Sequence, residues 1–143
     1  MNRDPALARL IAFWESLTPA TLGDLGQFYA LDAEFQDPFN KVQGLPAISK
    51  IFHDMFERLH DPRFHIRQSV QEGREVFLVW DFTFRIKSLA PERARSIHGT
   101  THLRLGDDGR VAYHRDYWDA AAELYAQLPL IGALMRFLAR RFA

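Results

Sequence analysis

The sequence contains no cysteine, which excludes disulfide bonds and thiolate chemistry. An excess of charge is also missing, because 18 Lys and Arg residues balance 18 Asp and Glu residues. Nucleic-acid-binding domains normally carry a clustered basic excess, so we expect no nucleic-acid partner. No apolar run approaches the roughly 20 residues of a membrane-spanning helix. The first residues do not lead into the apolar core of a signal peptide, and we therefore expect a cytoplasmic protein.

The chain does contain enough apolar side chains for one domain with a sizeable core. It has 143 residues, of which 48% are hydrophobic. Apolar residues at helical spacing predict three helices in the first half, over about 4–17, 18–29 and 46–60. Thr18 is the expected N-cap of the second helix, with Pro19 in its first turn. The pair Asp61-Pro62 is expected to end the third helix.

The second half of the chain has the alternation of apolar and polar residues that is typical of strands. The clearest case is 76–86, where every second residue is apolar. Further strands are predicted over 31–36, 64–70, 95–105 and 111–118, and Asp107-Asp108-Gly109 is a hairpin signal. Helices followed by a run of antiparallel strands predict an α+β fold, with the helices on one face of a curved sheet.

One carboxylate stands at the end of the first predicted strand. Residues 28–38 read Phe-Tyr-Ala-Leu-Asp-Ala-Glu-Phe-Gln-Asp-Pro, and Gly44 follows. Proline disfavours helical backbone at the residue before it, so Asp37 is expected to be extended. This makes Asp37 a candidate for chemistry. The structural alternative is a turn cap that accepts backbone N–H groups.

This segment, continued by Ala47-Ile48 and Phe52, closely resembles the early motif of ketosteroid isomerases. More widely it resembles the nuclear-transport-factor-2-like superfamily, which includes the SnoaL-like polyketide cyclases. Residues 101–118 are similar to the last hairpin of that superfamily. The resemblance spans about residues 5–119 and implies a cone-shaped, cystatin-like roll, in which N-terminal helices pack on a curved, mainly antiparallel sheet around a pocket. We expect such a domain over residues 1–119 and a C-terminal amphipathic helical extension over residues 120–143.

The resemblance also places individual residues. Asp37 falls on the general base of the isomerases, whose oxyanion hole is a tyrosine and a protonated aspartic acid. Those two positions hold Phe13 and Thr101 here, and a supporting tyrosine is replaced by Phe52. Donors aimed at developing negative charge contribute several kcal/mol each, so steroid isomerisation by that route is not expected.

The SnoaL-like cyclases offer a second assignment, with an acidic residue on a late strand as the base and a histidine nearby. On that pattern Asp116 is the acid/base residue, His114 is its partner, and both point to the same side of one strand. Asp37 is then a second carboxylate in the same pocket. The expected ligand-binding residues are Phe13, Trp14, Tyr29, Phe35, Phe52, Trp80, Phe82, Gly99, Thr101 and Trp118.

Structural interpretations of the same residues stay open at this point. Asp116 is an available ion-pair partner for Arg67 or Arg104. His114 alone is more typical of a satisfied core histidine, and the aromatic residues of 80–84 are typical of a core. A hairpin register shifted by one residue would instead gather four potential metal ligands on one face. These four residues are His98, His102, His114 and Asp116.

Two hypotheses for the function follow. The first is a cofactor-independent acid/base isomerase, cyclase or lyase, without a metal, that binds a small apolar ketone or polyketide-like molecule. The second is a non-catalytic ligand-binding or protein-interaction module. In the second case the amphipathic stripe of 124–142 caps the pocket, docks a partner or contacts a membrane surface, whereas simple packing on the domain is the structural alternative. The polar-aromatic outer face of the last hairpin favours a homodimer.

Overall fold

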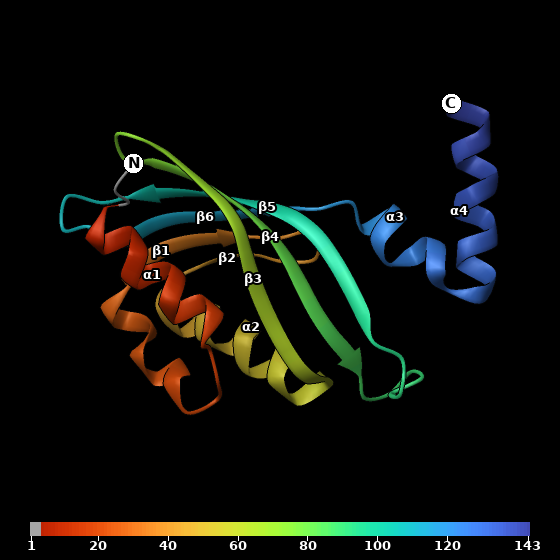
Figure 1. Ribbon diagram of the computed structural model, residues 1–143, viewed down its shortest axis with the longest axis horizontal. Coiled ribbons are helices and arrows are strands. Elements are labelled where there is room, and N and C mark those ends of the chain that lie inside the picture. Colours follow the sequence, from red (N-terminus) through yellow and green to blue (C-terminus); the bar gives the residue numbers. More distant parts are fainter. Residues whose placement is uncertain (1–3) are drawn as a thin grey trace.

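The computed structural model describes residues 4–143, and it has a six-stranded curved sheet with helices on one face (Figure 1). The strands lie in the order β2-β1-β6-β5-β4-β3, and only the pair β1–β6 is parallel. The strands are β1 (Tyr29–Gln36), β2 (Lys41–Gln43), β3 (Leu59–Glu72), β4 (Glu75–Ile86), β5 (Arg95–Leu105) and β6 (Val111–Tyr117). The helices are α1 (Pro5–Glu15), the 3-10 helix η1 (Thr21–Gln27), α2 (Leu45–Arg58), α3 (Ala120–Glu123), the 3-10 helix η2 (Tyr125–Gln127) and α4 (Pro129–Phe142). The predicted α+β architecture is confirmed.

The first helix begins where the side chain of Asp4 accepts a hydrogen bond from the backbone N–H of Ala6, at 2.9 Å. Its buried face carries four of the residues whose spacing predicted the helix, Leu7, Leu10, Ile11 and Trp14. Phe13 is buried as well. These residues pack in the core with residues of α2 and of the sheet.

The second predicted helix is wrong in type and in start. Residues Thr21–Gln27 form a 3-10 helix whose N-cap is Ala20 rather than Thr18. The hydroxyl of Thr18 accepts the backbone N–H of Thr21 at 3.2 Å, which holds the chain in a turn before the helix begins. Two glycines, Gly23 and Gly26, weaken an α-helix here, so the shorter 3-10 form is favoured.

The predicted end of the third helix at Asp61-Pro62 is also wrong. Helix α2 ends at Arg58, and β3 starts at the next residue. Asp61-Pro62 lies inside β3, where the pairing with β4 shifts between His60 and Arg63, and Asp61 has φ +48°. Proline cannot donate to a strand ladder, so it is accommodated at an irregular point of this edge strand.

The register of the last hairpin decides which histidines face the pocket. Thr101 pairs with Asp116 and Leu103 pairs with His114, which is the register that the resemblance implied. The shifted register is therefore wrong. The other two histidines of that alternative lie on the outer face, where His98 contacts Asp81 and His102 contacts Glu75.

After β6 the chain leaves the cone. Pro129 starts a new helix after η2. Figure 1 shows α4 standing away from the sheet and from α1, η1 and α2, so the interpretation as a helix packed on the domain is wrong. Its packing against η2 involves Gly132, a position at which a side chain would collide with the backbone of Ala126.

Candidate functional site

A chain of hydrogen bonds crosses the concave face of the sheet and ends on one carboxylate. It starts at the indole of Trp80 on β4, whose N–H donates to the hydroxyl oxygen of Thr101 at 2.7 Å. An indole N–H can only donate, so the Thr101 hydroxyl is free to donate onward. It does so to Oδ1 of Asp116 on β6, at 2.6 Å.

The same carboxylate oxygen receives a second donor. Nε2 of His114 lies 2.7 Å from Oδ1 of Asp116, and the hydroxyl of Tyr29 lies 2.7 Å from Nδ1 of His114. Because a carboxylate only accepts, the neutral imidazole carries its proton on Nε2 and accepts at Nδ1 from Tyr29. The network therefore fixes both the tautomer and the orientation of the His114 ring.

The network is buried at its Tyr29 end and open at its Asp116 end. Tyr29 is fully buried and His114 is 5% exposed, whereas the Asp116 side chain is 18% exposed. Burial raises the pKa of Tyr29 well above its usual value, and the charge of Asp116 raises it further. The phenol therefore stays protonated and remains a donor to His114.

Asp116 lines three pockets, and two of them reach into the core. The inner one has a volume of about 20 Å³, enough for a single water molecule, and reaches the Thr101 and His114 end of the network. The outer one has a volume of about 390 Å³ and opens between α2 and the sheet. Residues shared by the two linings are Phe52, Phe64, Trp80 and Asp116. Oδ2 of Asp116 accepts no hydrogen bond from the described residues and is the oxygen available to a ligand.

The second predicted carboxylate lies at the mouth of the outer pocket. Oδ1 of Asp37 accepts the backbone N–H groups of Phe39 and Asn40 at 2.8 and 2.7 Å. The side-chain amide of Asn40 lies 3.1 Å from both oxygens. Asp37 thus caps the turn between β1 and β2, as the structural alternative predicted, and it faces the same pocket as Asp116.

The predicted ligand-binding residues divide into three groups. Trp14, Phe52, Trp80 and Thr101 line the inner pocket. Phe35, Phe82 and Trp118 line the outer one, together with Phe52 and Trp80. Phe13, Tyr29 and Gly99 line neither pocket and lie behind the walls: Phe13 stacks on Phe28 with ring centres 4.4 Å apart, and Tyr29 supports His114.

Gly99 has a clear structural reason to be glycine. A Cβ atom at this position would lie 2.5 and 2.7 Å from two ring atoms of Trp80, and 3.0 Å from Cβ of Trp118. The indole of Trp80 can lie flat on the sheet and reach Thr101 only because that space is empty. Gly99 thereby sets the position of one wall that both pockets share.

The resemblance placed Phe13 and Thr101 at the oxyanion-hole positions of the isomerases. Phe13 is apolar, and the hydroxyl of Thr101 donates to Asp116. The ion-pair alternative for Asp116 is wrong, since Arg67 pairs with Asp81 and Arg104 pairs with Glu75 on the outer face. Within residues 4–143 no group of His, Asp and Glu side chains has the arrangement of a metal site.

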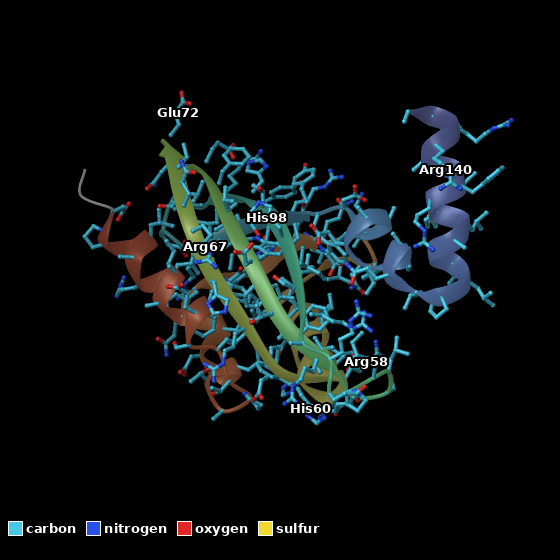
Figure 2. All side chains as sticks on the ribbon, turned by 45° about the vertical axis from the view of Figure 1, so that its right-hand side comes forward. Arg58, His60, Arg67, Glu72, His98 and Arg140 are labelled. Atoms are coloured by element: carbon cyan, nitrogen blue, oxygen red, sulfur yellow. The ribbon has the colours of Figure 1, made fainter. Side chains whose placement is uncertain are left out.

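Several pocket residues were not predicted from the sequence. Phe64 and Ile66 of β3 line the inner pocket, and the alternation of that strand was the signal that could have found them. Arg58 and Ser88 lie at the rim of the outer pocket. They come from a helix end and a loop, where no periodicity marks the side that faces a ligand. Figure 2 shows Arg58 at the lower end of the domain.

The sequence from residue 9 to residue 114 matches the family model of the SnoaL-like domain. The chain belongs to the SnoaL-like domain family. Residues 9–114 contain five of the six strands in full, together with His114, whereas Asp116 and the C-terminal helices follow them. No curated protein matches the sequence significantly. No helix within residues 4–143 is long and apolar enough to cross a membrane.

Solved structures support the SnoaL-like, nuclear-transport-factor-2-like fold. A ketosteroid-isomerase-like protein from Catenulispora acidiphila, in complex with trimethylamine, has a TM-score of 0.74 and 18% identity over 90% of this chain and 96% of its own. A putative SnoaL-like polyketide cyclase from Shewanella putrefaciens has a TM-score of 0.71 and 20% identity, over 88% of this chain and 100% of its own. TerC, co-crystallised with polyporic acid, has a TM-score of 0.70 and 14% identity, over 83% of this chain and 95% of its own. At these identities the likeness concerns the SnoaL-like fold alone.

Proposed function

We propose that this protein binds a small apolar carbonyl compound in the outer pocket and that Asp116 moves a proton on it, as in an isomerase or a cyclase. The observation that carries the proposal is the way in which the two oxygens of the Asp116 carboxylate are bonded. Its Oδ1 is held by Thr101 and His114, and its Oδ2 is free where the two pockets meet. A general base needs this combination of fixed orientation and one open oxygen.

His114 and Thr101 are positioning residues in this mechanism. Their two hydrogen bonds to Oδ1 hold the carboxyl group in one orientation and leave Oδ2 without a protein partner among the described residues. When Oδ2 takes a proton from the ligand, the same donors keep the carboxyl group in place, so that the proton can be returned at another atom. The apolar walls formed by Phe35, Phe82 and Trp118 suit a flat, largely apolar ligand.

The lack of a free donor in the network narrows the ligand class. An enolate of a simple ketone concentrates its charge on one oxygen and needs strong donors there. In a 1,3-dicarbonyl or quinone-like compound two oxygens share the charge, which lowers the need for an oxyanion hole. This supports a polyketide-like ligand, as do a polyketide-cyclase-like neighbour and a neighbour crystallised with polyporic acid.

The test follows exchange of the proton and does not require the product to be known. Protein in deuterated buffer is incubated with a panel of aromatic 1,3-diketones, and uptake of deuterium at the carbon between the carbonyl groups is followed by mass spectrometry. We expect accelerated uptake that falls at least about 100-fold in Asp116→Asn. The variant Asp37→Asn is the matched control, since it removes the other carboxylate of the pocket and is expected to keep the exchange.

The second candidate is a non-catalytic binding module, favoured by the commitment of every side-chain donor in the network to a protein partner. It predicts that the same compounds bind to the outer pocket without accelerated exchange. Equal exchange rates for Asp116→Asn and the unmodified protein, measured with the ligand bound, would exclude Asp116 as the base.

A further inference from the structure

The C-terminal helix α4 carries a wide apolar face that the domain does not cover. At 100° per residue, its apolar side chains occupy an arc of about 160°. They are Leu130, Ile131, Leu134, Met135, Phe137, Leu138 and Phe142. Six of the seven are among the most exposed large hydrophobic residues of the described chain, and Leu130 and Phe142 are 86% and 89% exposed. An exposed apolar face of this size normally marks a site of contact with another protein or with a membrane.

The other side of α4 is the one that packs on the protein. Gly132 lies against the backbone of Ala126, and the guanidinium of Arg136 donates to the Ala126 carbonyl at 2.8 Å. Both residues lie opposite the apolar arc on the helix. Their contacts with η2 therefore turn the arc outwards, away from the segment that holds the helix.

The charge of the tail has one sign. Three arginines lie on α4, and no Asp or Glu side chain follows Glu123, although the chain as a whole is neutral. Arg140 and Arg141 stand in the last turn, where Arg141 lies over the ring of Phe137 at 5.9 Å. Figure 2 shows Arg140 on the helix that stands clear of the domain. At 100° per residue Arg141 falls within the apolar arc and Arg140 lies about 60° beyond its edge. An apolar arc with arginines in it and beside it complements a surface that is both apolar and anionic.

We propose that α4 is a docking helix for anionic lipid membranes and lies in the plane of the lipid surface. Its 14 residues span about 21 Å, which is too short to cross a bilayer and long enough to lie on one. The apolar arc enters the acyl region, while Arg140 and Arg141 reach the headgroups from the ends of their long side chains. A second copy of α4 is a poorer occupant, because it brings arginines and no acidic partner.

The docking helix starts close to the outer pocket. Leu124, which precedes it, lines that pocket, and the ring of Tyr125 packs edge-on against Phe39 with centres 6.3 Å apart. A docked helix would therefore keep the mouth of the pocket near the lipid surface, where apolar compounds collect.

Co-sedimentation of the full chain with vesicles tests the proposal. Vesicles of phosphatidylcholine and phosphatidylserine in equal parts should carry the protein into the pellet, and pure phosphatidylcholine should carry much less. The double variant Arg140→Gln/Arg141→Gln should bind about 30-fold more weakly, from about 1 kcal/mol for each charge. Leu134→Gln/Leu138→Gln should abolish pelleting. The matched control Arg9→Gln/Arg93→Gln removes two exposed charges elsewhere and should leave binding unchanged.

Three results would overturn the proposal. The first is an intact chain that stays in the supernatant with the anionic vesicles. The second is equal loss of binding in the control and in the Arg140/Arg141 variant, which would mean that net charge and not the helix is responsible. The third is a dimer that Leu134→Gln/Leu138→Gln dissociates while lipid binding is unchanged, which would assign the apolar face to a second copy. The helix lies outside the core, so unchanged thermal unfolding of each variant confirms that the fold is intact.

Discussion

The hydroxyl of Tyr29 lies 2.7 Å from Nδ1 of His114 and joins β1 to the neighbouring strand β6. The two residues are separated by most of the chain, and parallel pairing of β1 with β6 brings them together. Tyr29 does not line the pockets, yet it determines which nitrogen of His114 carries the proton that holds Asp116. The proposed chemistry at Asp116 therefore depends on a residue that the ligand does not touch.

Removing that hydroxyl should weaken the fold and disturb the histidine. In Tyr29→Phe the buried Nδ1 of His114 loses its donor, and an unsatisfied buried polar group costs about 1–3 kcal/mol of the free energy of unfolding. Urea denaturation measures the loss, and ¹⁵N NMR of the imidazole should show a mixture of tautomers in place of one. Tyr113→Phe on the outer face is the control. Unchanged stability and an unchanged His114 spectrum would show that the hydrogen bond has no role in orienting the ring.

The same phenol predicts how stability changes in alkali. The pKa of Tyr29 is raised in the folded protein, mainly by burial, whereas the unfolded chain has a value near 10. Below about pH 10 both states hold the proton and the stabilisation is complete. Above it the unfolded chain releases the proton first, so the free energy of unfolding falls as the pH rises through the folded-state pKa. Denaturation between about pH 9 and 11 should show a shallower fall in Tyr29→Phe, and parallel curves would contradict the assignment.

The sequence was sufficient for the architecture because the architecture rests on local patterns. The alternation along β4 and the turn at Gly109, whose φ is +79°, are properties of neighbouring residues. The resemblance supplied the hairpin register, which placed His114 and Asp116 on the pocket side. The helix end predicted at Asp61-Pro62 was wrong, because an Asp-Pro pair is compatible both with a helix end and with an irregular point of an edge strand.

The hydrogen-bond network itself could not be predicted from the sequence. Its five members come from four strands, and no spacing along the chain records that Trp80 reaches Thr101 or that Tyr29 reaches His114. Asp37 was undecided for a related reason, because a carboxylate before proline looks the same whether it caps a turn or faces a ligand. The packing of α4 was not predictable either, since an amphipathic stripe does not say whether the domain covers it.

Substitution of Gly99 tests whether the empty space beneath Trp80 shapes the site. In Gly99→Ala the new methyl group collides with the indole, which must move away from Thr101. We expect a loss of about 1–3 kcal/mol in unfolding free energy and weaker binding of pocket ligands. Gly23→Ala is the control, because nothing lies within 4 Å of its Cβ position. Equal effects of the two variants on Trp fluorescence and on ligand binding would show that Gly99 tolerates a side chain.

Two substitutions of Asp37 distinguish its role as a turn cap from a role as the general base. Asn keeps an oxygen that accepts the N–H groups of Phe39 and Asn40, whereas Ala removes it. If Asp37 acts as a turn cap, Asp37→Asn should cost a few tenths of a kcal/mol of unfolding free energy and Asp37→Ala about 1 kcal/mol. Deuterium exchange into the ligand should then persist in both variants, measured at a temperature where both are folded. Loss of exchange in Asp37→Asn with unchanged stability would transfer the role of base from Asp116 to Asp37, since only the charge of the carboxylate would have been removed.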